Sequence, residues 1–209
     1  MNRRELGIEE QGAGSEGLAA GDRAERSVAA SPGPVVVRRE TRETSVRVEL
    51  AVGDAPADVR TGEPFLDHML ATLARYAGLS LIVEARGDMR HHLVEDVAIT
   101  VGTAFARLLP ATAARYGERT VPMDDALVQC AIDTGGRFFY RGPLPSTIYD
   151  HWMRSFAEHA RATLHLRVIR GRDRHHVVEA AFKALGLALR QAMVETGAVF
   201  STKGAVMEC

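Results

Sequence analysis

Three observations predict an α/β (α+β) protein built from two copies of one unit. The block RGDMRHHLVE at residues 86–95 recurs as RGRDRHHVVE at residues 170–179, with seven of ten letters identical at an offset of 84 (170 − 86). After each block, apolar residues recur at the spacing of an amphipathic helix. Before each block lies an alternating run rich in β-branched residues, at 79–85 and 163–169, which predicts a strand.

The repeat extends further upstream. The pair Asp67-His68 in PFLDHML matches Asp150-His151 in IYDHWM, and each pair lies in a predicted first helix. Strand candidates beginning at residues 43 and 125 precede these helices. Each half therefore predicts strands, helix, strand and helix, with halves at about 35–115 and 120–209 and a junction at 110–122. We expect one folded domain over residues 35–209.

Composition excludes several classes of function. A formal net charge of −1 over 209 residues argues against binding along nucleic acid. No apolar run approaches the length of about 20 residues that a membrane span needs. Residues 1–34, rich in Gly, Ala, Ser and Glu, predict a disordered tail with no secretion signal. Two cysteines make no disulfide framework, so we expect a reduced, cytoplasmic protein.

Six of the eight histidines fall at repeated positions, and this predicts metal binding. On a helix, His91 and Glu95 share a face, whereas His92 points about 100° away. One residue of each adjacent pair can therefore reach a second metal, and such a site can draw ligands from different subunits. Two sites of three imidazoles and one carboxylate would suit Mn²⁺, Fe²⁺, Co²⁺ or Zn²⁺. The candidate ligands are His68, His91, His92, Glu95, His151, His175, His176 and Glu179.

Other acids and histidines near these positions are less specific. Asp67, Asp96 and Asp150 can accept from ligand imidazoles, or can be ordinary helix-surface or capping acids. His159 and His165 have no counterparts in the first half, so we expect them not to be ligands.

Seven motifs occur in order along the chain: FLDHML, HHLVED, RYG, PMDDAL, GGR, HHVVEAAFKAL and STKG. In this combination, from about residue 35 to the end, the chain resembles the imidazoleglycerol-phosphate dehydratase family. The resemblance implies a duplicated half-domain of the ribosomal protein S5 domain 2-like fold, with two mixed four-stranded sheets flanking a helical layer. It implies two Mn²⁺ ions per active site, held by the same eight ligands. It also implies a homo-oligomeric shell of 24 subunits with interfacial active sites.

The implied reaction dehydrates D-erythro-imidazole glycerol phosphate to imidazole acetol phosphate in histidine biosynthesis. Metal ions favour the imidazolate form of the substrate ring, which expels the neighbouring hydroxyl to give a diazafulvene-like intermediate. The resemblance points to Glu43 as the base that then removes a proton, and to His68 as a second substrate contact. The same pattern implies phosphate binding by Arg115, Arg137, Lys183, Ser201 and Lys203.

The chain departs from the family pattern in three places. Tyr76 stands where members usually have a histidine, and the segments before His91 and between Arg137 and His151 are shorter. Two alternatives follow from the residues. A diverged dinuclear-metal enzyme, such as a hydrolase, could act on a related phosphate. A non-catalytic, metal-assembled shell protein could use the sites only to join subunits.

Overall fold

The computed structural model describes residues 33–199, so Ser201, Lys203 and nearly all of the predicted tail lie outside the described residues. The first half contains β1 (Val35–Glu40), β2 (Thr44–Val52), β3 (Asp58–Arg60), α1 (Pro64–Ala77), β4 (Leu79–Gly87) and α2 (Arg90–Leu108). The second half repeats this order with β5 (Tyr116–Met123), β6 (Ala126–Asp133), β7 (Phe139–Arg141), α3 (Thr147–His159), β8 (Thr163–Arg170) and α4 (Arg174–Ala192). The predicted duplication is confirmed at the level of every element.

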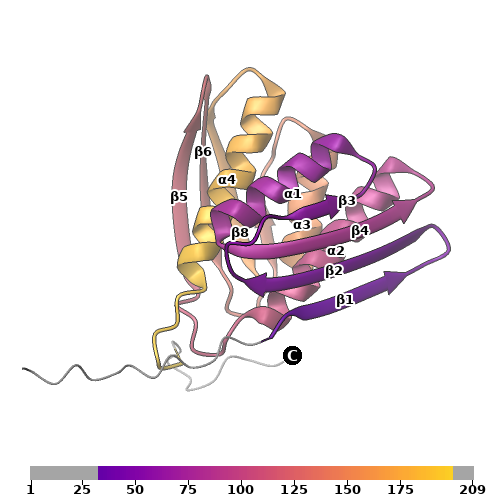
Figure 1. The fold of residues 1–209 in the computed structure, drawn as a ribbon. Coiled ribbons are helices and arrows are strands. Elements are labelled where there is room, and N and C mark those ends of the chain that lie inside the picture. The colour runs from indigo at the N-terminus through magenta and orange to yellow at the C-terminus, as the bar shows by residue number, and fades with distance from the viewer. Residues whose placement is uncertain (1–32, 200–209) are drawn as a thin grey trace, which may run out of the picture. The chain divides into compact units, whose positions relative to one another are not determined.

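Each half forms one mixed four-stranded sheet. The strand orders are β1-β2-β4-β3 and β5-β6-β8-β7, with the last strand of each sheet parallel to its neighbour and the others antiparallel. The four helices lie between the two sheets (Figure 1). The predicted arrangement of sheets flanking a helical layer is therefore confirmed. Among the described residues, no helix is long and apolar enough to cross a membrane.

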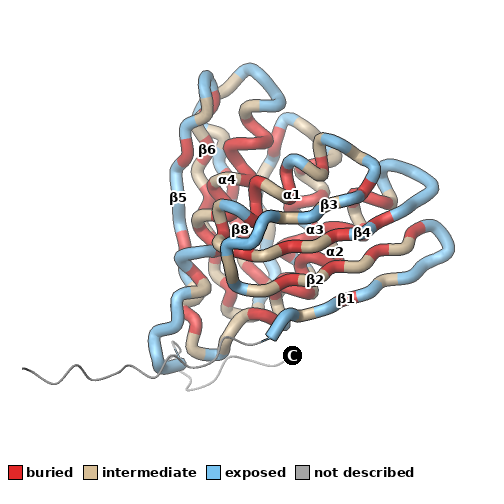
Figure 2. Tube along the Cα trace, in the orientation of Figure 1, coloured by how far each residue is buried: buried red, intermediate tan, exposed pale blue. Residues whose placement is uncertain are grey.

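The buried residues follow the sequence pattern. In β2, burial alternates along the strand, so that Val46, Val48 and Leu50 face the helices. The helical layer carries the aromatic core, in which Trp152 lies 4.7 Å from Phe182 and 5.4 Å from Phe156 between ring centroids. Buried segments gather in this layer and on the strands that line it (Figure 2).

Helix–helix contacts join the two halves. α1 packs on α4 and α2 packs on α3, so each contact pairs a helix of one half with a helix of the other. A glycine lies at each crossing, Gly102 in α2 and Gly186 in α4, again separated by 84 (186 − 102). A Cβ atom added at Gly102 would lie 2.6 Å from the Phe156 carbonyl oxygen of α3. These glycines permit the close approach that brings the site residues together.

The region expected as the junction is more ordered than predicted. Residues 110–122 contain most of β5, which is an edge strand of the second sheet. Pro122 lies inside this strand, and an edge strand tolerates proline because one side of the strand needs no ladder hydrogen bonds. The second sheet therefore begins at Tyr116.

Candidate metal centre and active site

The first group of candidate ligands lies where α1 crosses α4. His68 on α1 meets His175 and Glu179 on α4, and we call this set the Glu179 cluster. The Nε2 atoms of His68 and His175 lie 3.4 Å and 3.1 Å from Glu179 Oε2. Asp173 caps α4 by accepting a hydrogen bond from the His175 backbone N–H, which fixes the first turn that carries these ligands.

The second group lies where α2 crosses α3. His151 on α3 meets His91 and Glu95 on α2, and we call this set the Glu95 cluster. His91 Nε2 lies 3.7 Å from Glu95 Oε2, and His151 Nε2 lies 3.3 Å from Glu95 Oε1. In both clusters the potential ligand atoms all lie within 4.8 Å of one another. Each cluster therefore combines one histidine from one half with a His-x-x-x-Glu pair from the other.

The side chains of both clusters fit a divalent metal ion. Two imidazoles and one carboxylate form the mixed N/O set that Mn²⁺, Fe²⁺, Co²⁺ and Zn²⁺ accept. In the described part of the chain, His151 Nε2 is buried and makes no hydrogen bond, although Glu95 Oε1 lies 3.3 Å away. A buried polar atom of this kind is costly unless something binds it, and a coordinated cation would satisfy it.

The remaining two histidine candidates form ion pairs with acids outside the clusters, each within its own half. His92 Nδ1 lies 3.0 Å from Asp88 Oδ1 and 3.4 Å from Glu43 Oε2. The hydrogen bond to Asp88 raises the pKa of His92, with smaller contributions from the charges of Glu43 and Asp88. The structure thus places three of four candidate ligands of each half in the two clusters, and the fourth beside a separate set of acids.

His176 has the corresponding position in the second half. Its Nδ1 lies 2.8 Å from Asp125 Oδ1, and its Nε2 lies 3.4 Å from Asp124 Oδ2. Sequence reasoning missed Asp88, Asp124 and Asp125 as neighbours of these histidines. For Asp125 the repeat could have predicted this contact. Asp125 begins the strand candidate that matches the one beginning at Glu43, so the two acids have equivalent positions in the two halves.

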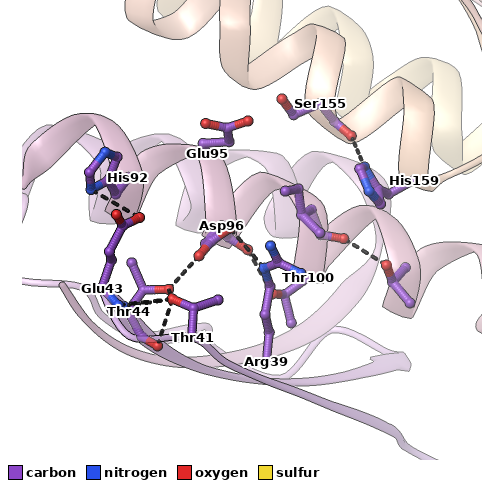
Figure 3. Close-up of polar contacts among 12 residues, drawn as sticks. Arg39, Thr41, Glu43, Thr44, His92, Glu95, Asp96, Thr100, Ser155 and His159 are labelled. Atoms are coloured by element: carbon purple, nitrogen blue, oxygen red, sulfur yellow. Dashed lines mark hydrogen bonds and ion pairs between the residues drawn. The ribbon is translucent and has the colours of Figure 1, made fainter.

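A polar network fixes the β1–β2 hairpin against α2. Asp96 is 8% exposed and accepts hydrogen bonds from the Thr44 hydroxyl and from Arg39 Nε, the latter at 2.7 Å. Figure 3 shows Asp96 directed toward these strand residues and Glu95 projecting from another side of α2. Asp96 therefore anchors the hairpin, and its side chain accepts hydrogen bonds from Thr44 and Arg39 rather than from an imidazole.

The same network positions Glu43. The Thr41 hydroxyl accepts hydrogen bonds from the backbone N–H groups of Glu43 and Thr44, at 3.1 Å and 2.9 Å. This turn brings the Glu43 carboxylate beside His92, with its side chain 56% exposed (Figure 3). An exposed carboxylate next to a histidine is available to a ligand from outside the chain.

Asp67 and Asp150 also serve as anchors. Asp67 Oδ1 accepts from the Thr61 backbone N–H and hydroxyl, at 3.0 Å and 2.5 Å. Asp150 Oδ1 accepts from the Tyr140 hydroxyl at 2.6 Å and from the Leu144 N–H at 2.8 Å. Both acids tie the first turn of their helix to the segment before it, and these hydrogen bonds are not to an imidazole.

The candidate phosphate-binding residues have different surroundings. Lys183 Nζ lies 2.9 Å from Glu179 Oε1, so it contacts the Glu179 cluster directly. Arg115 instead pairs with both carboxylate oxygens of Asp133, at 3.1 Å. Arg137 is exposed just before β7. The structure thus joins Lys183 to the candidate metal ligands, while the Arg115 guanidinium is engaged by a carboxylate.

Comparison with known proteins identifies the family. The family model described as imidazoleglycerol-phosphate dehydratase matches residues 61–189. A relative of that name from Pyrobaculum calidifontis is 50% identical over 183 residues, which cover 80% of this chain and 97% of the relative. One from Acidothermus cellulolyticus is 42% identical over 199 residues, covering 87% and 97%.

Solved structures agree with this match. The crystal structure of the dehydratase from Pyrococcus furiosus has a TM-score of 0.74 and 38% identity, and the match covers 81% of this chain and 99% of that one. The structure from Staphylococcus aureus has a TM-score of 0.71 and 30% identity, with coverage of 78% and 99%. The duplicated fold and its paired His/Glu clusters are therefore those of a chain that belongs to the imidazoleglycerol-phosphate dehydratase family.

Proposed function

We propose that the protein is a hydro-lyase that dehydrates D-erythro-imidazole glycerol phosphate to imidazole acetol phosphate in histidine biosynthesis. The observation that carries this proposal is the pair of His/Glu clusters at the two helix crossings, in a chain of this family. We place the enzyme in the cytoplasm. Cys130 is a free, buried thiol, which suits a reducing compartment.

The proposed cofactor is Mn²⁺, with two ions per active site. The Glu179 and Glu95 clusters each supply three ligands. His92 and His176 lie with other acids, so we assign them as fourth ligands to clusters of neighbouring subunits. This assignment requires a homo-oligomer with interfacial active sites, and a shell of 24 subunits is the proposed assembly.

Two cations bound to the substrate ring would favour its imidazolate form, which provides the electrons that expel the adjacent hydroxyl. The protein then has to remove a proton from the neighbouring carbon, after which the resulting enol ketonises. Glu43 is the proposed base, because its carboxylate is exposed and lies 3.4 Å from His92. A metal ion bound by His92 in the assembly would therefore have the Glu43 carboxylate close to it. His68, in the Glu179 cluster, is a further proposed substrate contact.

The substrate phosphate is proposed to bind Arg115, Arg137, Lys183, Ser201 and Lys203. Asp133 now occupies the fork of the Arg115 guanidinium with the geometry that a phosphate would use. Lys183 lies beside the Glu179 cluster and would bring the phosphate end of the substrate close to it.

The first test is turnover of imidazole glycerol phosphate after chelation and again after Mn²⁺ is restored. We expect activity to vanish and then to return. Full metal loading without turnover would refute the proposed reaction. Phosphate release from simple esters would favour a dinuclear hydrolase instead, and metal-dependent assembly without any turnover would favour a shell protein.

The role of Glu43 has its own test. The variant Glu43→Gln should lower kcat by roughly 10²- to 10⁴-fold, as expected for loss of a general base, while Mn²⁺ content stays unchanged. Glu49→Gln is the matched control, because Glu49 lies on β2, the strand that follows Glu43, and pairs with Arg47 instead. Equal kcat values for the two variants would remove Glu43 from the mechanism.

The interfacial sites are tested by His92→Ala. We expect this variant to bind less Mn²⁺ and to form smaller assemblies in light scattering. A wild-type protein that is monomeric while fully loaded with metal would contradict the interfacial assignment.

A further inference from the structure

The two clusters share the same ligand types, but one neighbouring residue differs. Lys183 follows Glu179 by one helical turn, and the equivalent position in the first half, 99 (183 − 84), is Ile99. Both side chains are half-buried. The duplication therefore places a cation beside one cluster and a hydrocarbon beside the other.

Lys183 is held firmly in this position. Its ammonium lies 2.9 Å from Glu179 Oε1, 3.6 Å from the Met123 sulfur and 5.8 Å from the centroid of the Tyr76 ring. The Glu179 carboxylate is therefore already paired with a lysine.

The carboxylate of the other cluster has different partners. Within the described residues, Glu95 forms ion pairs with His91 and His151. Its side chain is 36% exposed, whereas that of Glu179 is 9% exposed. The ion-pair partners of Glu95 are therefore two imidazoles, in place of the ammonium group beside Glu179.

These differences bear on metal affinity. A lysine near a divalent ion repels that ion, and its hydrogen bond occupies a carboxylate oxygen that a metal could use. The same hydrogen bond also orients Glu179, but the helix and surrounding burial already fix this side chain, so repulsion is the larger effect. The proposed fourth ligand is a histidine at both sites, so it does not offset the difference in metal affinity that Lys183 causes.

We propose that the two metal sites are unequal, with the Glu95 cluster binding metal first and Lys183 making the Glu179 cluster the weaker site. The expected difference is roughly ten- to hundredfold in dissociation constant, the range for changes around metal ligands. This inference rests on the metal-binding part of the proposed function.

The experiment titrates chelated, full-length protein with Mn²⁺ and follows free Mn²⁺ by electron paramagnetic resonance. Wild type should show two classes of site. Lys183→Met keeps the apolar stem and removes the charge, so the weaker class should tighten toward the stronger one. Ile99→Lys is the matched variant, which should weaken the tight class. His68→Asn and His151→Asn identify the classes, because they should remove the weak and the tight sites respectively.

Several outcomes would overturn the inference. One is a single class of site in wild type, and another is a weak class that Lys183→Met leaves unchanged or weakens. Each of these leaves metal binding and the proposed reaction intact. No Mn²⁺ binding at all would instead overturn the metal assignment and this inference together. If Lys183→Met does not fold by circular dichroism, Ile99→Lys decides alone, and an unchanged tight class in that variant refutes the role of the neighbouring charge.

Discussion

Adding one methyl group at either helix crossing should destabilise the protein and loosen the metal clusters. The substitutions are Gly102→Ala in α2 and Gly186→Ala in α4. At position 102, the new Cβ would lie 2.6 Å from the Phe156 carbonyl oxygen and 3.0 Å from the Ala160 nitrogen. At position 186, it would lie 2.8 Å from the Tyr76 Cβ and 2.9 Å from the Leu73 carbonyl oxygen. Most of these atoms belong to the backbone, so the crossing helix has to move.

The magnitude follows from two opposed effects. In an exposed helix, Gly→Ala stabilises by about 1 kcal/mol, because alanine has the higher helix propensity. Overpacking a close contact costs typically about 1–3 kcal/mol, and contact with the backbone puts these positions toward the upper end. The net loss is therefore about 1–2 kcal/mol, which lowers Tm by roughly 2–8 °C in a protein of this size.

The assay is thermal unfolding by circular dichroism at one fixed protein concentration, with chelator present so that metal does not add stability. Gly33→Ala is the control, since nothing lies within 4 Å of the added Cβ. Each crossing variant should also bind Mn²⁺ more weakly at the cluster that its crossing forms. If either crossing variant melts at or above the wild-type temperature, close helix approach is not what positions the ligands.

Three further predictions address other parts of the structure. Asp96→Asn should lower the free energy of unfolding by roughly 1–3 kcal/mol through loss of charge-assisted hydrogen bonds. It should also lower kcat, because the hairpin that carries Glu43 loosens. An unchanged free energy of unfolding in chemical denaturation would contradict this prediction. Burial raises the pKa of the Cys130 thiol, so in a Cys209→Ser background a thiol reagent should react only after unfolding; rapid labelling of native protein would oppose it. Backbone N–H groups and then His176 lower the pKa of Asp125 to about 2. A depressed pKa contributes stability that is present above the unfolded value of 3.8 and is lost as pH falls toward 2. In chelated protein, Asp125→Asn should therefore make the free energy of unfolding fall less steeply with pH over that range. Parallel curves for the variant and the wild type would refute this role.

Much of the fold could be predicted because each helix and strand pattern occurs twice, so one half supports the interpretation of the other. The long helices α2 and α4 and the central strands have clear periodicity, and each appears twice. The strands β3 and β7 have three residues each, too few to show alternation. The strand β5 was not predicted, because Pro110 and Pro122 lie at the two ends of a segment with the composition of a linker. An edge strand accommodates proline.

The division of the ligands between clusters was beyond the sequence. A repeat identifies equivalent residues, such as His68 and His151, but it does not say whether each pairs with its own half or with the other. Pairing within a half was equally compatible with the pattern. The helix crossings decide it, and they depend on close approach at two glycines whose significance is visible only in three dimensions.

The departures from internal symmetry lie beside the shared ligands, and they differ in the two halves. In the first half, Asp96 follows Glu95 and anchors the hairpin that holds Glu43. The second half has alanine at the equivalent position, 180 (96 + 84), and there Asp125 instead accepts from the backbone of the β8–α4 loop, at 2.6 Å from the Arg172 nitrogen. The second half in turn carries Lys183 where the first has Ile99. The two halves therefore have similar metal clusters but different neighbouring residues. In the first half these residues hold the candidate base Glu43, and in the second half they include the candidate phosphate ligand Lys183. Under the proposed roles of Glu43 and Lys183, the two halves contribute different groups to one reaction, a base from the first and a phosphate ligand from the second.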